Sequence, residues 1–491
     1  MYERRVPYRE FSRAVRRFHR DRLLDKVAAA SAAIQAGRVA RARLPIRSPV
    51  QQFTLAAVAR TALAESMVYR SDEPVTDQDL TRLCHLAIQV DHPDIPDHGI
   101  LAAPVMRRLL GRLSYQQQLF VHAELEDITR TLALFDDHDP ALTDMPTAAQ
   151  WEQALGVPLP TYLTLAFTAF VGVGVHAGRF PHAAIAAAAR VGAFGEGVDA
   201  HTATAVIDTH FAADRAELEL TAKSGETALF AGGRQLWLSN PLLANPMVRR
   251  PDGYSAPIAP FVLHKITPLG MYFTGIGAFG DGFPKLVGES FEKLVGRHLR
   301  LLESQGAQVY PEVRYGHENK LTCDWLVVLP KLVLLVEAKG MRSIEPARLG
   351  DEDGLKTLAS RVQKARNQIA TTAKLIAGRI PELAHIPDDR PIRGLVVTLE
   401  PLHLVDTYVY EDLLEATAVE TATASAHSVE EILPTVARLP DGQARLLDAL
   451  TAKPPTPVAL DRAVKGVVLE RNPNSLKLWD NWRAATPVPI D

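Results

Sequence analysis

Cysteine is scarce in this chain of 491 residues, which contains only Cys84 and Cys323. Two thiols cannot build a disulfide framework or a four-thiolate metal centre, and both cysteines have apolar neighbours that favour core positions. Long apolar runs are also missing. The most apolar stretch, residues 162–177, includes two threonines and a histidine and is shorter than the ~20 residues of a membrane-spanning helix. No secretory signal is recognisable at the start. We therefore expect a cytoplasmic protein without a membrane segment.

Net charge is almost absent as well, because 54 Lys and Arg residues face 57 Asp and Glu residues, which gives −3. The charges are nevertheless segregated along the chain. The net values are +9 over residues 1–47, −9 over 48–285, +4 over 286–379 and −7 over 380–491. Because blocks of one sign are typical of interaction surfaces, overall neutrality does not exclude a polyanionic partner.

The densest basic stretch is an N-terminal arm that runs from Arg4 to Arg22. Two interpretations of this arm remain open. It could contact the phosphate backbone of a nucleic acid, which gives sequence-independent binding that weakens with salt. Alternatively, its arginines could lie on a solvated helix face and pair with the acidic block of residues 48–285.

Apolar periodicity predicts a mainly α N-terminal region followed by an α/β domain. Residues 1–231 show repeated helical spacing and predict a mostly helical domain of unknown role. Residues 232–284 contain seven prolines and a cluster of glycines, which predicts an irregular connector. Residues 285–415 predict a helix, a short strand, a hairpin, a long helix and a further strand, which is the order of a compact α/β domain. Residues 416–491 predict a C-terminal helical segment and a tail.

Two weaker patterns in the sequence are not interpreted as ligand-binding sites. Residues 275–280 match the dinucleotide fingerprint G-x-G-x-x-G, but no βαβ unit surrounds them, so we expect a flexible loop. Residues 91–98 and 136–139 combine aspartate, histidine and proline. That composition is typical of solvated turns, and no second histidine pair with metal-ligand spacing accompanies it.

The candidate catalytic side chains lie on a predicted β-hairpin. Strands over residues 322–329 and 332–339 are joined at Pro330-Lys331. Six residues lie on each side of this turn, counted out to Asp324 on one side and to Glu337 on the other. We therefore expect Asp324 and Glu337 side by side, with Lys339 on the same strand face as Glu337 because side chains alternate.

Two carboxylates at the end of apolar strands are costly to desolvate, and a hard divalent cation such as Mg2+ compensates that cost. Such an ion lowers the pKa of a bound water and neutralises charge at a phosphate. The neighbouring lysine would act on that water or on the transition state. The alternative is that Glu337 and Lys339 form an exposed ion pair without any catalytic role.

Asp324 followed by Glu337-Ala338-Lys339 resembles the signature of the PD-(D/E)XK nuclease superfamily, the restriction-endonuclease-like fold. Residues 288–292 look like the first helix of its Mrr-type and junction-resolvase branches, in which a glutamate joins the metal site. Glu292 suits this role better than Glu289, because Glu292 borders the apolar stripe of the expected helix.

Further positions agree with the resemblance or depart from it. Gln368, on the expected second long helix, resembles the glutamine that some branches place near the site. Arg361 and Lys364 lie on the same flank of that helix and are candidate phosphate contacts. Cys323 stands where many members have proline, and Thr372 stands where exonuclease-type relatives have tyrosine. The second departure argues against a processive exonuclease.

The resemblance covers residues 285–415 and implies a mixed sheet flanked by helices. It implies Mg2+, for which Mn2+ can substitute, bound by Asp324, Glu337 and Glu292, with Lys339 and Gln368 completing the catalytic set. The expected protein is then a metal-dependent DNA endonuclease of restriction, repair or anti-phage defence, and a homodimer by family analogy. The alternative is a catalytically inactive protein of the same fold that binds nucleic acid or acts as a scaffold. Residues 1–284 resemble no family.

Overall fold

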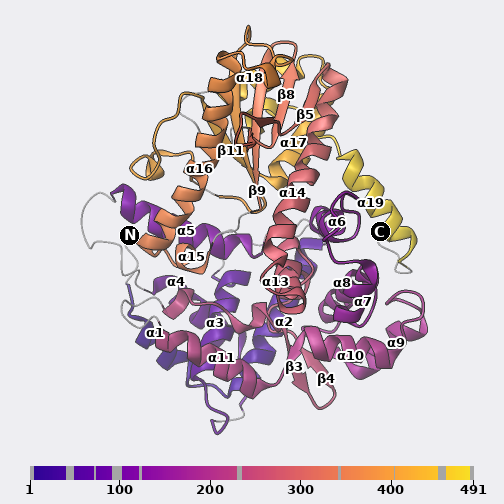
Figure 1. Cartoon of the computed structure of the whole chain (residues 1–491). Coiled ribbons are helices and arrows are strands. Elements are labelled where there is room, and N and C mark those ends of the chain that lie inside the picture. Colours follow the sequence, from indigo (N-terminus) through magenta and orange to yellow (C-terminus); the bar gives the residue numbers. More distant parts are fainter. Residues whose placement is uncertain are drawn as a thin grey trace.

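The computed structural model describes residues 5–39, 49–70, 73–90, 102–120, 124–228, 235–340, 344–402, 404–451 and 460–486. Helices predominate in these residues, and they flank two mixed sheets of four and five strands. Figure 1 shows the first half of the chain in the lower part of the molecule and the five-stranded sheet in the upper part. Arg4 and residues 91–98 lie outside the described residues.

The first half consists mainly of helices, in agreement with its apolar periodicity. Three of them begin at side chains that accept a hydrogen bond from a backbone N–H of the first turn, namely Thr76, Thr147 and Asp199. The helices are α1 (Tyr8–Val15), α2 (Arg20–Val39), α3 (Gln52–Glu65), α4 (Asp77–Gln89), α5 (Ala103–Gln118), α6 (Glu124–Phe135), α7 (Ala148–Leu155), α8 (Leu159–Val175), α9 (His182–Arg190), α10 (Ala200–His210), α11 (Arg215–Ala228) and the 3-10 helix η1 (Gln235–Trp237).

One stretch of the described residues, Ala148–Val175, has the length and composition to cross a membrane. It comprises α7 and α8, and 67% of its most apolar window is buried inside the protein. Tyr162, Leu163 and Leu165 of α8 are completely buried in the apolar core. The apolar sequence of α8 is therefore explained by its position inside the helical half.

Residues 235–284 are not an irregular connector, contrary to the prediction. They form η2 (Pro241–Leu243), β3 (Met247–Arg250), β4 (Gly253–Ser255), α12 (Pro260–His264) and α13 (Pro268–Phe279). The two strands join β1 (Arg179–Pro181) and β2 (Ala212–Ala213) in a sheet of order β1-β4-β3-β2. Most of these prolines stand where a missing N–H costs little, at the first positions of helices and in the turn between β3 and β4.

The glycine-rich segment 275–280 is helical as far as Phe279, so the expected loop is also wrong. A Cβ atom on Gly275 would lie only 2.2 Å from the ring of Phe283. The glycine thus permits close packing between α13 and α14 (Phe283–Leu299). Phe283 stacks on Phe135, with ring centroids 5.9 Å apart, and contacts Trp151 edge-on. Helix packing accounts for this glycine without a nucleotide.

The second half contains the five-stranded sheet, in the order β11-β10-β9-β8-β5. Its strands are β5 (Gln308–Pro311), β8 (Trp325–Leu329), β9 (Leu332–Lys339), β10 (Ile392–Thr398) and β11 (Thr421–Ser425), and a separate ribbon pairs β6 (Arg314–Tyr315) with β7 (Lys320–Leu321). Neighbours from β5 to β9 are antiparallel, whereas β9, β10 and β11 are parallel. Leu329 pairs with Leu332, which confirms the predicted hairpin with its turn at Pro330-Lys331.

Helices cover both faces of this sheet, and Figure 1 shows α16 (Glu352–Ala377) on one side with α14 and α17 (Ala426–Arg438) on the other. Alternate residues of β9 pack on the two sides. Leu335 belongs to the apolar cluster that contains Ile369 of α16, and Leu334 belongs to the core that contains α14 and α17. Burial on both faces explains the continuously apolar strands. Because β11 and α17 complete the sheet and its cover, the predicted boundary at 415 is too early.

Shorter elements connect these layers and close the chain. They are η3 (Arg300–Gln305), α15 (Glu345–Arg348), η4 (Pro381–Leu383), η5 (Tyr408–Tyr410), α18 (Gly442–Thr451), η6 (Leu460–Val464) and α19 (Pro473–Ala484).

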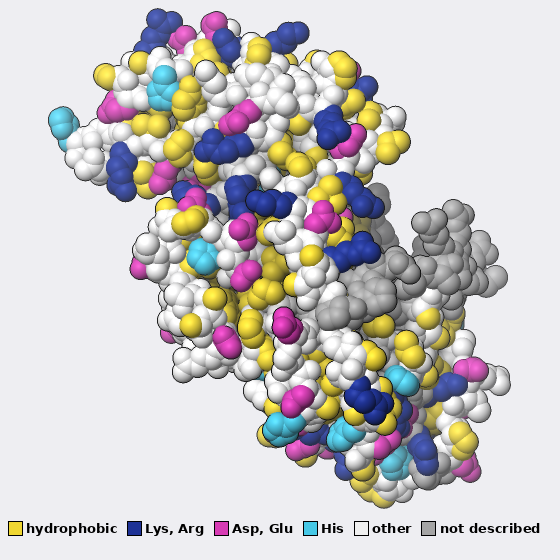
Figure 2. Space-filling view, turned by 90° about the vertical axis from the view of Figure 1, so that its right-hand side faces the viewer, with side chains coloured by type: hydrophobic (Ala, Val, Ile, Leu, Met, Phe, Trp, Pro, Cys, Tyr) yellow, Lys and Arg dark blue, Asp and Glu magenta, His cyan; other side chains and the backbone are white. Residues whose placement is uncertain are grey.

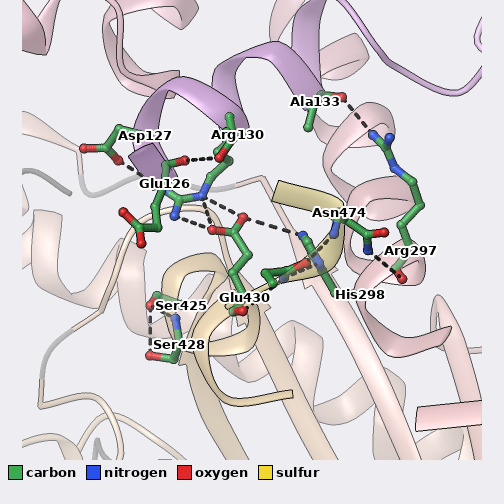
Figure 3. A network of polar contacts seen from close by, with 12 residues as sticks. Glu126, Asp127, Arg130, Ala133, Arg297, His298, Ser425, Ser428, Glu430 and Asn474 are labelled. Atoms are coloured by element: carbon green, nitrogen blue, oxygen red, sulfur yellow. Dashed lines mark hydrogen bonds and ion pairs between the residues drawn. The ribbon is translucent and has the colours of Figure 1, made fainter. Parts of the chain in front are cut away.

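The two halves are joined by a shared apolar core and by buried ion pairs. A single cluster of buried residues extends from α6 and α8 through α14 to the sheet. Arg107 of α5 is completely buried and donates to the Val409 carbonyl at 2.7 Å and to Asp412 at 2.5 Å. Arg130 of α6 pairs with Glu430 of α17, as Figure 3 shows. The boundary expected near residue 285 therefore does not separate two independent cores.

The charge blocks of the sequence largely pair with one another. Arg20, which is 4% exposed, binds Glu219 at 2.5 Å, and Arg16 binds Glu65. On the face shown in Figure 2, Lys and Arg side chains lie among Asp and Glu side chains. Pairing within the chain therefore applies to part of the N-terminal arm.

Candidate functional site

Asp324 and Glu337 meet at the end of the β8–β9 hairpin. The register that pairs Trp325 with Val336 continues to them. The backbone N–H of Asp324 donates to Glu337 Oε2 at 3.3 Å, and the N–H of Ala338 donates to Asp324 Oδ2 at 2.7 Å. Asp324 is 7% exposed and Glu337 is completely buried. The hairpin backbone thus holds two buried carboxylates in a fixed relation.

Lys339 lies on the same strand face as Glu337, and its Nζ donates to Glu337 Oε1. Burial raises the pKa of Glu337, and repulsion from Asp324 raises it further, while Lys339 opposes both effects. Burial also raises the pKa of Asp324, against the attraction of Lys339, and the charge of Glu292 adds to the rise. One lysine therefore does not neutralise this group of carboxylates.

Glu292 comes to the site on α14, which packs beside β8. The indole Nε1 of Trp325 donates to the Glu292 carbonyl at 3.0 Å. The ring lies against Gly296, where a Cβ atom would come within 2.1 Å of it. The Glu292 carboxylate binds Lys293 Nζ at 2.8 Å. By contrast, Glu289 is 40% exposed and lies 3.4 Å from a lysine of its own helix. The charge of Glu292 acts on both Asp324 and Lys339, whereas Glu289 forms an ion pair on its own helix.

Gln368 lies near the site but contacts backbone rather than the carboxylates. Its Nε2 donates to the Thr322 carbonyl at 3.0 Å, and the neighbouring Thr372 Oγ1 accepts from the Cys323 N–H at 2.8 Å. These two bonds tie α16 to the segment just before Asp324. Gln368 is therefore a positioning residue in this arrangement. The Cys323 thiol is buried, and burial raises its pKa, as expected for a core cysteine.

Glu312, which the sequence analysis does not select, also lies at this site. Burial and repulsion from Glu292 raise its pKa, while the charges of Lys293, Arg314 and Lys339 lower it. Glu312 directly follows β5 and belongs to no motif. The antiparallel pairing of β5 with β8 brings it close to the hairpin end.

The donor set suits a hard divalent cation. Within the part of the chain that the structure describes, no three His, Cys, Asp or Glu side chains form a group that could hold a metal ion. Mg2+ usually binds through one or two carboxylates and keeps several waters, whereas structural zinc takes four protein ligands. Asp324 and Glu337 supply such a pair, and burial raises the pKa of both carboxyl groups, so a bound cation would favour their ionised forms. These residues fit Mg2+ or Mn2+.

Comparisons of the chain with protein-family models, with curated proteins and with solved structures gave no match. The functional argument therefore depends on the side chains at the hairpin end and on their surroundings.

Proposed function

We propose that this protein is a metal-dependent nuclease that hydrolyses phosphodiester bonds through a restriction-endonuclease-like domain. The observation that carries the proposal is the pair of buried carboxylates, Asp324 and Glu337, held beside Lys339 at the end of a sheet. The helices on both sheet faces and the β8–β9 hairpin support the fold assignment. The resemblance of Asp324 and Glu337-Ala338-Lys339 to the nuclease signature supports the reaction type.

Each residue has a distinct role in this proposal. Asp324 and Glu337 would hold Mg2+ or Mn2+, and Glu292 would hold the ion or one of its waters. A metal ion bound there would supply a water of lowered pKa and offset negative charge at the phosphate. Lys339 exchanges its bond to Glu337 for one to the attacking water or to a phosphate oxygen. Gln368 keeps the backbone before Asp324 in place.

DNA is the proposed substrate. The resemblance favours it, and so does the local excess of basic residues over positions 286–379. Arg361 and Lys364 are exposed on α16, three residues apart, with Gln368 one turn further on. Neither basic side chain has an ion-pair or hydrogen-bond partner among the described residues. They are suitably placed to contact phosphates close to the hairpin end.

Cleavage of a covalently closed plasmid tests the proposal. We expect nicked or linear product with Mg2+ or Mn2+ and none with EDTA, and a closed circle offers no end to an exonuclease. Asp324→Asn, Glu337→Gln and Lys339→Ala should each slow cleavage by roughly 100-fold or more, and the control Glu289→Gln should cleave like the wild type. Linear product without a nicked intermediate would indicate paired active sites, as in a homodimer.

Two cleavage results would refute the nuclease proposal. If the wild-type protein cuts neither DNA nor RNA with either metal ion, or if Asp324→Ala leaves cleavage unchanged, the enzymatic proposal is wrong. Binding of duplex DNA without cleavage would then favour the inactive nucleic-acid-binding protein.

A further inference from the structure

A cleft of about 640 Å3 lies in the helical half, between α1, the end of α3, α11 and η1. Figure 1 shows α1, α3 and α11 in the lower part of the molecule, away from the five-stranded sheet. Small-molecule sites typically occupy ~300–1,000 Å3, so this cleft has the size of a metabolite site. None of its lining residues belongs to the candidate nuclease site.

Three arginines line one side of the cleft. Arg9, Arg13 and Arg16 follow one another at helical intervals of four and three residues and therefore share one face of α1 and its C-terminal cap. The opposite face of α1 is anchored by Phe11 and Val15, which are completely buried. The buried face thus fixes the direction in which the arginine face points.

Most other charges of the cleft are matched within the protein. Arg16 binds Glu65, the cleft's acidic residue, and Lys223 binds Glu219 at 2.5 Å. The guanidinium groups of Arg9 and Arg13 have no partner among the described residues. The cleft therefore retains two positive charges that an anionic ligand can neutralise, and guanidinium forks match phosphate oxygens closely.

The rest of the lining is suited to an organic ligand rather than to a bare anion. Gln235 also lines the cleft, and its buried Oε1 accepts no hydrogen bond from the described residues. A ligand donor that reaches this oxygen would therefore satisfy an unpaired acceptor. Ala64 and Met67 add apolar surface, and Tyr8 adds an aromatic ring. A ligand with phosphate groups, an N–H or O–H donor and a flat ring would use all three features.

We propose that this cleft binds a nucleoside phosphate with at least two negative charges. Its phosphates bind Arg9 and Arg13, a sugar or base donor binds Gln235, and the base lies against Tyr8 and Met67. A continuous nucleic-acid strand suits the cleft less well, because only two unmatched cations are present. Binding here goes beyond the proposed nuclease activity and does not depend on it.

Isothermal titration calorimetry on the full chain tests the proposal, in EDTA so that no metal-dependent reaction contributes. The probes are ATP, GTP, AMP, inorganic phosphate and a short single-stranded oligonucleotide. We expect ATP or GTP to bind more tightly than AMP, and inorganic phosphate to bind at least about 10-fold more weakly. Arg9→Ala/Arg13→Ala should weaken nucleotide binding by roughly 10-fold or more.

Two further variants separate a lost site from a lost fold. Arg190→Ala/Arg483→Ala removes two exposed arginines elsewhere and should bind like the wild type. Met67→Glu, a change at a residue that is 38% exposed, should weaken binding by charge repulsion while the thermal unfolding midpoint stays the same. The proposal is overturned if no nucleotide binds at millimolar concentration, or if Arg9→Ala/Arg13→Ala binds nucleotide as the wild type does. It is also overturned if only the oligonucleotide binds in an Arg9- and Arg13-dependent way.

Discussion

Replacing Glu430 with glutamine should destabilise this protein strongly, because it leaves a buried arginine without its counter-charge. The side chains of Arg130 and Glu430 are 7% and 4% exposed. Arg130 Nε donates to the two carboxylate oxygens at 2.8 and 3.0 Å, and Nη2 donates to Oε2. Figure 3 shows Arg130 between Glu430 and Asp127, with His298 beside the same carboxylate. Glutamine keeps the shape of Glu430 but lacks its negative charge.

The magnitude follows from the electrostatics of this pair. Burial alone would raise the pKa of Glu430, but the charge and hydrogen bonds of Arg130, with the His298 ring 3.6 Å away, outweigh it and lower the pKa to about 2. Relative to ~4.3 in an unfolded chain, at ~1.4 kcal/mol per tenfold change in proton affinity, this corresponds to about 3 kcal/mol. Breaking a buried ion pair typically costs ~3–5 kcal/mol, which is the same range.

The lowered pKa also predicts how stability depends on pH. Because the native pKa lies below the unfolded value, the contribution of Glu430 is complete above roughly pH 5 and is lost as the pH falls towards 2. The wild-type protein should therefore lose more stability than Glu430→Gln between about pH 5 and 3.

Urea unfolding followed by circular dichroism and tryptophan fluorescence provides the measurement. The control is Asp252→Asn, which breaks the exposed pair between Arg179 and Asp252, with side chains 36% and 65% exposed. This change should cost less than about 1 kcal/mol. If Glu430→Gln costs no more than the control, or if both proteins respond to acid alike, the reasoning about this ion pair is refuted.

Three further predictions concern the candidate site. Gly296→Val should displace the Trp325 ring, change tryptophan fluorescence and cost roughly 1–3 kcal/mol, whereas Gly288→Ala, with open space around it, should be neutral or slightly stabilising. Mn2+ at ~100 times its Kd should stabilise the protein by about 2.7 kcal/mol and so raise its melting temperature. EDTA should abolish this rise, and the Asp324→Asn variant should not show it. Gln368→Ala should slow plasmid cleavage by roughly 10-fold without changing the dependence on metal concentration, because its amide supports backbone; a changed metal dependence would contradict that role.

Much of the candidate site could be predicted from local sequence. An antiparallel hairpin has a register set by its turn, so the Pro330-Lys331 turn and the apolar strands bring Asp324 beside Glu337. Alternation along β9 likewise places Lys339 with Glu337. Helical periodicity was enough to prefer Glu292 over Glu289. These relations involve short separations within one hairpin or one helix, where geometry follows from residue spacing.

Other features had no such local signal. The residues of β11, Thr421–Ser425, are small and partly polar, and they form a strand because they pair with the free edge of β10. Prolines in residues 235–284 mark helix starts and a tight turn, but composition alone does not distinguish these from breaks. Glu312 reaches the site only through the pairing of β5 with β8.

Local residue spacing is enough to specify the helical first half, the hairpin and the approach of Asp324 to Glu337, because each depends on contacts between residues close in the chain. The pairing of charges across the molecule depends instead on the long-range fold. Arg130 and Glu430 are 300 positions apart. Arg16 pairs with Glu65 at the end of α3, whereas Arg9 and Arg13 line the cleft without such a partner among the described residues. Which charged side chains form ion pairs depends on how the helices pack and on which side chains are desolvated. Residue spacing along the chain does not directly encode the helix packing or the desolvation.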